Sequence, residues 1–117
     1  MRDKMSLAPI FNEKGICYIL SYLDVKIKIL EIGWNNISKL KHPELENKFW
    51  ELTKTLIKPT LVRQSKKDKQ VYLYYLKLNK KYFCAICKHY NNKEGFLITA
   101  YYTYKPEGAK KIWPKKK

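Results

Sequence analysis

His42 is the ionisable side chain of this sequence with the clearest potential for chemistry. It lies in the segment "KHPEL", between two stretches expected to be helical, at the position that would cap the second helix. Histidine is not among the residues favoured at a helix N-cap, and its ordinary pKa allows proton transfer near neutral pH. His42 is therefore a candidate general acid or base. The alternative is an exposed histidine in a turn.

Arg63 is the second candidate, because it is one of only two arginines among 25 basic residues. It lies in the segment "VRQS", which ends with Ser65 and reads as a short strand. A guanidinium binds phosphate through two parallel hydrogen bonds, a geometry that lysine does not reproduce. Arg63 is thus a candidate phosphate ligand, and the alternative is a solvated charge on a strand.

Cys84 and Cys87 form a C-x-x-C motif with His89 two residues further on. Residues i and i+3 of a strand point to opposite faces, so two such thiols do not bind one metal ion without a break in the strand. The sequence holds no second C-x-x-C. We interpret both cysteines as small buried apolar side chains and predict no metal site and no cofactor.

Composition predicts a single folded domain that binds a polyanion. The 117 residues are 45% hydrophobic, which excludes disorder, and carry a net charge of +15 with only 10 acidic residues. Lysine-rich codon bias explains part of that charge but not the shortage of acids. The apolar run 16–23 is too short to span a membrane and lacks a signal-peptide cleavage site. Together with the odd cysteine count, this predicts a cytoplasmic protein without a membrane partner.

Periodicity divides the chain into a flexible arm (1–14), one domain (15–113) and a basic tail (114–117). Two alternating segments predict an N-terminal β-hairpin, Trp34, Ile37 and Leu40 share a face of a short helix, and a second helix begins at Pro43. The buried stripe of that second helix is Leu45, Phe49, Leu52 and Leu56. Four strands follow, at 60–64, 70–78, 82–90 and 95–102. The predicted fold is α+β: a helical pair followed by, and packed on one face of, a four-stranded antiparallel sheet, with the N-terminal hairpin.

An even-length turn between the last two strands would pair Ala85 with Ala100 and Cys87 with Ile98. The face under the helices would then hold Phe83, Ala85, Cys87, Phe96, Ile98 and Ala100. The opposite face would hold Cys84, Ile86, Lys88, Leu97, Thr99 and Tyr101. Tyrosines such as Tyr72 and Tyr74, together with Lys88, would form a basic stacking surface for unpaired bases, with ordinary strand propensity as the alternative.

The order of several short segments resembles the phage-associated and toxin nucleases of the barnase–EndoU–colicin–RelE-like group. Trp34 is followed by "HPEL" (42–45), "ELTKTLIKPTLVRQS" (51–65), "VYLYY" (71–75), "YFCAICK" (82–88), "GFLITAY" (95–101) and "KKIW" (110–113). The resemblance covers about two thirds of the chain, from Trp34 to Trp113.

The resemblance implies RNA binding on the face away from the helices and metal-independent cleavage, in which the 2′-hydroxyl attacks the adjacent phosphate. It implies an acid or base role for His42, phosphate contacts for Arg63 and Ser65, active-face roles for Thr99 and Tyr101, and an RNA contact for Trp113. The expected partners are RNA and an inhibitor or antitoxin protein. Alternative functions are a non-catalytic nucleic-acid-binding module and a subunit of a toxin–antitoxin or phage assembly.

Overall fold

The computed structural model describes residues 11–106 and 110–113 of the chain. The tail predicted at 114–117 and most of the arm predicted at 1–14 lie outside the described residues. Phe11, in the described part of that arm, packs edge to face on Phe49 with ring centroids 5.8 Å apart.

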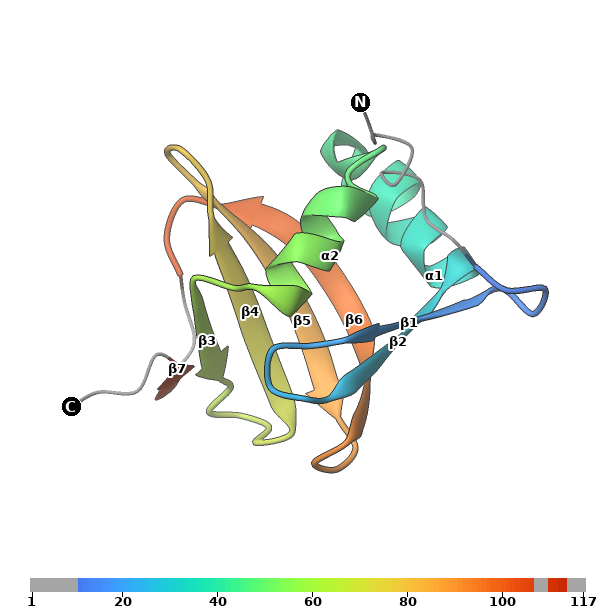
Figure 1. Cartoon of the computed structure of the whole chain (residues 1–117). Coiled ribbons are helices and arrows are strands. Elements are labelled where there is room, and N and C mark those ends of the chain that lie inside the picture. The colour runs from blue at the N-terminus through green and yellow to red at the C-terminus, as the bar shows by residue number, and fades with distance from the viewer. Residues whose placement is uncertain (1–10, 107–109, 114–117) are drawn as a thin grey trace.

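The described residues form one sheet with a helical segment inserted between its second and third strands (Figure 1). The strands are β1 (Ile16–Leu20), β2 (Lys26–Leu30), β3 (Leu61–Gln64), β4 (Val71–Lys77), β5 (Tyr82–His89), β6 (Glu94–Thr103) and β7 (Lys110–Trp113). The helical segment consists of α1 (Glu31–Asn35), the π-helix η2 (Asn36–Lys41), the 3₁₀ turn η3 (Pro43–Leu45) and α2 (Phe49–Ile57).

The predicted four-stranded antiparallel sheet under a helical pair is wrong. The sheet is mixed and seven-stranded, in the order β1-β2-β6-β5-β4-β3-β7, with two short α-helices. The hairpin of β1 and β2 is present, but it extends the sheet because β2 pairs in parallel with β6, from Lys26 with Glu94 to Lys28 with Phe96. A parallel pair requires a long crossover, so nothing near either strand in the sequence signals the pairing.

The stretch formed by α1 and η2, which we call the first helical segment, changes midway from α-helical to π-helical hydrogen bonding. This change alters which side chains the segment buries. Trp34 and Ile37 are buried as predicted, but Leu40 is 74% exposed. The π-helical turns of η2 bond residue i to i+5 and hold more residues per turn than an α-helix. Leu40 is thereby rotated away from the stripe that α-helical spacing assigns to it. Among the described residues, no helix has the length and apolar content needed to cross a membrane.

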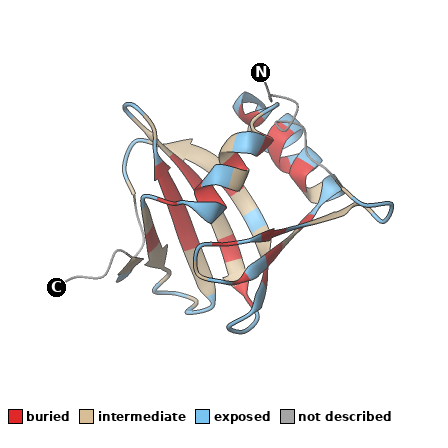
Figure 2. Cartoon of the chain, viewed as in Figure 1, coloured by how far each residue is buried: buried red, intermediate tan, exposed pale blue. Residues whose placement is uncertain are grey.

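Helix α2 supplies the main apolar contact with the sheet. It begins at Phe49 and not at Pro43, because Asn47 has φ 65° and interrupts the helix that the sequence predicted. Leu45, Phe49, Leu52 and Leu56 are nevertheless all buried. Figure 2 shows the buried inner side of α2 facing the buried middle of β4 and β5.

A β-bulge in β6 alters the predicted register with β5. Ala85 pairs with Ala100, as predicted, but Cys87 pairs with Leu97 and not with Ile98. Ile98 is the extra residue, and it is 42% exposed. The bulge places the β6 residues before it on the face opposite to the predicted one. Leu97 therefore packs against the hydrophobic core between α2 and the sheet, which we call the main core. Thr99, which follows the bulge, keeps its predicted face.

Candidate functional site

The π-helix η2 ends at His42 and fixes the position of its backbone. The His42 N–H donates to the Ile37 carbonyl (2.8 Å), and the His42 carbonyl accepts from the Leu45 N–H (2.8 Å). Pro43 starts η3 directly afterwards, so the chain changes direction at the histidine. π-Helical turns are rare and occur often at functional sites. The local sequence therefore holds His42 at a defined break between two helical turns.

The His42 ring lies beside Tyr101 of β6. Their ring centroids are 6.0 Å apart, with an angle of 46° between the planes. His42 Nδ1 is 3.7 Å from Glu44 Oε2, and the histidine side chain is 32% exposed. A protonated His42 would thus be attracted by an adjacent carboxylate while staying open to solvent. The structure brings together two residues, His42 and Tyr101, that the resemblance to the nuclease group assigned to one site.

Thr99 and Arg63 lie in one row across the sheet face opposite α2. Arg63 pairs with Leu73, Leu73 with Ile86, and Ile86 with Thr99. The row crosses three strand spacings of about 4.8 Å, which places the two ends about 14 Å apart. Thr99 is two residues from Tyr101 on β6 and so lies on the same face of the sheet as Tyr101. Arg63 is on that face too, but at the far end of the row.

One nitrogen atom of the Arg63 side chain lacks a hydrogen-bond partner within the described part of the chain. Arg63 is half-buried, and its Nε atom is buried without a hydrogen-bond partner among the described residues. Lys111 of β7 pairs with Arg63 in the sheet and adds a second cation to that end of the row. The two cations give this end of the face a positive potential suited to phosphate.

Ser65 and Lys88 are engaged with the loop between β3 and β4. The Ser65 hydroxyl accepts the N–H groups of Lys67 (3.2 Å) and Asp68 (3.4 Å), which makes Ser65 a turn-forming residue. Lys88 Nζ is 3.3 Å from Asp68 Oδ2. A hydrogen bond from the Gln70 N–H, with a smaller contribution from Lys88, lowers the pKa of Asp68. Lys88 lies on the sheet face opposite α2, as predicted. It belongs to the row of side chains that neighbours the row of Arg63 and Thr99.

Tyr72 and Tyr74 do not join Lys88 on a stacking surface, which corrects the prediction for both residues. Tyr74 is fully buried on the α2 side, and its hydroxyl donates to Ser21 Oγ (3.0 Å) and lies 3.0 Å from His89 Nε2. Burial raises the pKa of Tyr74. Tyr72 is half-buried on the same side and stacks on His89 at 4.0 Å. A fully buried tyrosine cannot stack on a base.

Trp113 is also far from the His42 end of the sheet. It lies on β7, pairs with Val62, and packs against the main core. Its ring is 4.5 Å from that of Tyr22, which is in the turn of the N-terminal hairpin. This position makes Trp113 a contact between the two ends of the described chain, and it does not place the indole on the face that holds Thr99.

Both cysteines of the C-x-x-C motif are buried, as predicted. Cys84 and Cys87 are buried in separate clusters on opposite faces of the sheet. Burial raises the pKa of Cys84 to about 12 and also raises the pKa of Cys87. Both thiols are therefore protonated and unreactive at neutral pH.

His89 is a buried ionisable residue for which the sequence predicted no role. Burial lowers its pKa to about 4, so it is neutral at pH 7. A signal was available: strand alternation places His89 in phase with Phe83, Ala85 and Cys87, which are all buried. It links β5 to β4 and to the hairpin turn through Tyr74 and not to the His42 site.

The fold and the site define a small α+β protein with a basic, mixed sheet and a histidine beside its β6 strand. Comparison with protein-family models, with curated proteins and with solved structures gave no match. The geometry of the site is therefore what supports a function for this protein.

Proposed function

We propose that this protein is a metal-independent endoribonuclease that cleaves RNA by attack of a 2′-hydroxyl on the adjacent phosphate. The observation that supports this proposal most directly is the position of His42 beside Tyr101 of β6. The net charge of +15 supplies the attraction to RNA. Since the substrate brings its own nucleophile, the protein has only to align it, transfer protons and stabilise the added negative charge.

Each residue of the site has a distinct role in this proposal. His42 transfers one of the two protons that move, either from the 2′-hydroxyl or to the leaving 5′-oxygen, with Glu44 orienting the ring. Solvent water accepts or supplies the other proton. Thr99 donates a hydrogen bond to a phosphate oxygen, and Tyr101, whose side chain is hydrogen-bonded to Cys84, packs beside the His42 ring. Arg63, about 14 Å from Thr99 along the row, contacts a phosphate further along the RNA strand and not the one that reacts. The three free cysteines suit the reducing cytoplasm that we propose as its location.

Cleavage of labelled RNA in EDTA tests the proposal. We expect fragments that end in 2′,3′-cyclic phosphate or 3′-phosphate, and a rate at least about 100-fold lower for His42→Ala. Leu40→Ala, at an exposed neighbouring position, is the matched control and should cleave normally. The wild-type rate should change between roughly pH 5 and pH 8, as expected of proton transfer by a histidine. A flat profile over that range would exclude His42 from proton transfer.

A non-catalytic nucleic-acid-binding protein is the second candidate, and the separation of Arg63 from Thr99 favours it. Under this alternative the same RNA would bind without cleavage in every salt and with every RNA structure tested. Both candidates require that binding weaken as salt is added, because phosphate contacts release counterions. Salt-independent binding would contradict both, and would favour a subunit whose charge meets an acidic protein.

A further inference from the structure

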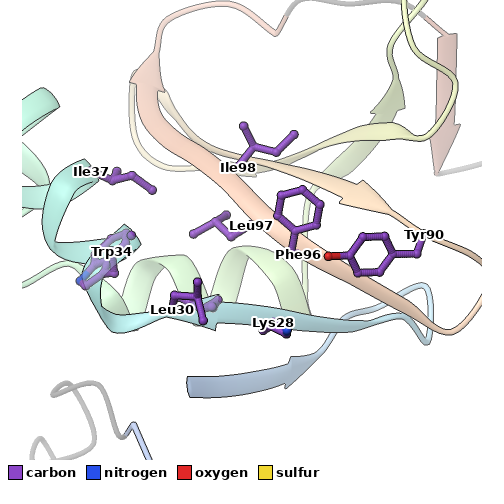
Figure 3. Close-up of a pocket in the computed structure, with 10 residues that line it drawn as sticks. Lys28, Leu30, Trp34, Ile37, Tyr90, Phe96, Leu97 and Ile98 are labelled. Atoms are coloured by element: carbon purple, nitrogen blue, oxygen red, sulfur yellow. The ribbon is translucent and has the colours of Figure 1, made fainter. Parts of the chain in front are cut away.

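An apolar groove opens where β2 diverges from β6 towards α1. Figure 3 shows its side chains converging from β2, from the first helical segment and from β6. The groove is lined by Lys28, Ile29, Leu30, Gly33, Trp34, Ile37, Tyr90, Phe96, Leu97 and Ile98. Leu30 and Ile98, on its two sides, are 45% and 42% exposed. These exposed apolar side chains flank a hollow that reaches Trp34 of the core.

One wall of the groove is a strand edge. β2 pairs with β6 only as far as Phe96, while β5 pairs with the other side of β6 as far as Thr103. Within residues 11–106 and 110–113, no further strand pairs with β6 on the groove side. Alternate residues of a strand direct their N–H and C=O groups to each edge, and such an edge accepts an added strand. The groove thus combines backbone hydrogen-bonding groups with apolar side chains.

We propose that this groove binds an extended acidic segment of a partner protein, which adds to β6 as a further strand. Strand addition gains affinity from main-chain hydrogen bonds and specificity from pockets for alternate side chains. Apolar side chains of the segment would enter the groove against Trp34 and Leu97. We assign acidic side chains to the intervening positions of the segment because two lysines lie here: Lys28 lines the groove, and Lys26 lines the adjoining hollow. Glu94 is the single carboxylate that lines this hollow.

The bound segment also affects the candidate active site. Ile98 lies at the groove, and Thr99 is the next residue of β6. A strand added along β6 would extend towards His42 and obstruct the approach of RNA. This regulatory consequence rests on the proposed nuclease function, whereas binding of the segment does not.

Fluorescence anisotropy with a labelled nine-residue peptide of alternating valine and glutamate tests the binding. We expect at least tenfold weaker binding by a peptide of alternating valine and lysine, and by the acidic peptide methylated at every second backbone nitrogen. Binding should also slow amide hydrogen exchange in β6 beyond Phe96. Equal affinity of the methylated peptide would overturn strand addition, and no binding at millimolar peptide would overturn the proposal.

Matched variants locate the site. Ile98→Asn should weaken binding at least fivefold, while Ile32→Asn, at a 71% exposed position of α1 outside the groove, should leave it unchanged. Equal effects of the two variants would overturn the assignment. Protection of β6 that rises with protein concentration alone would identify a second copy of the chain as the occupant and overturn a separate partner. RNA cleavage without peptide binding would refute this inference alone, and peptide binding without cleavage would refute only the nuclease.

Discussion

The buried histidine of β5 should make folding stability depend on pH. His89 is 7% exposed, its Nε2 atom lies 3.0 Å from the Tyr74 hydroxyl, and its ring stacks on Tyr72. Burial lowers its pKa from 6.5 to about 4. Protonation in the folded state would place a charge in this buried cluster, so His89 is neutral in the folded protein at pH 7.

The sign and the size of the effect follow from the two pKa values. Between pH 6.5 and pH 4 the unfolded chain binds a proton at His89 that the folded protein does not, so the free energy of unfolding falls as the pH falls. This loss of unfolding free energy is absent well above pH 6.5 and grows progressively as the pH falls towards 4. At pH 5 the loss amounts to up to about 2 kcal/mol, since each pH unit between the two pKa values is worth about 1.4 kcal/mol.

Urea denaturation at pH 7 and pH 5 measures this contribution. Wild type should lose stability over this interval, and His42→Gln, which replaces the only other histidine in the chain, is the matched control. His89→Gln should lose up to about 2 kcal/mol less over the same interval. An equal loss in His89→Gln would refute the reasoning. If that variant does not fold, an NMR titration of His89 in the wild-type protein measures its pKa directly. A pKa near 6.5 would contradict the proposed effect of burial.

Two further predictions concern close contacts. An added Cβ at Gly95 would lie 2.4 Å from the Lys88 carbonyl oxygen and 3.1 Å from the His89 Cα, both backbone atoms, so Gly95→Ala should cost about 2–3 kcal/mol in urea denaturation. An unchanged midpoint would show that β5 and β6 can separate locally. Tyr102→Phe removes the 2.6 Å hydrogen bond from the tyrosine hydroxyl to Glu51 Oε1 and should cost about 1–2 kcal/mol in thermal denaturation. Glu51→Gln keeps an acceptor and should cost less; a larger loss would contradict this account.

The sequence predicts those parts of the fold that depend on local alternation. The positions of β4, β5 and β6 and the pairing of Ala85 with Ala100 follow from period-2 patterns joined by short turns. The parallel pairing of β2 with β6 and the addition of β7 to β3 depend on contacts between distant segments. Such contacts are selected by packing in three dimensions, so no local pattern announces them.

Local sequence patterns indicated only part of the candidate site. His42 and Tyr101 lie side by side, but only the break at His42 and the sheet face of Tyr101 followed from local patterns, while their association in one site was implied by the resemblance. The faces of Tyr72 and Tyr74 did not follow from such patterns, because the strand "VYLYYLK" (71–77) carries apolar or aromatic side chains in both phases. Alternation shows that two tyrosines share a face, but when both faces are apolar it does not show which one meets the helices.

The order of the strands has a consequence for synthesis on the ribosome. The hairpin of β1 and β2 is made early, yet its partner in the sheet begins at Glu94, 68 residues after Lys26 (94 − 26). At about 5–20 residues per second, β2 waits roughly 3–14 s before β6 has been made. During that interval Ile27 and Ile29, which are buried in the finished sheet, lack their final environment. A nascent chain stalled before β6 should therefore recruit chaperones that bind apolar strands, and release from them should follow the synthesis of residues 94–96.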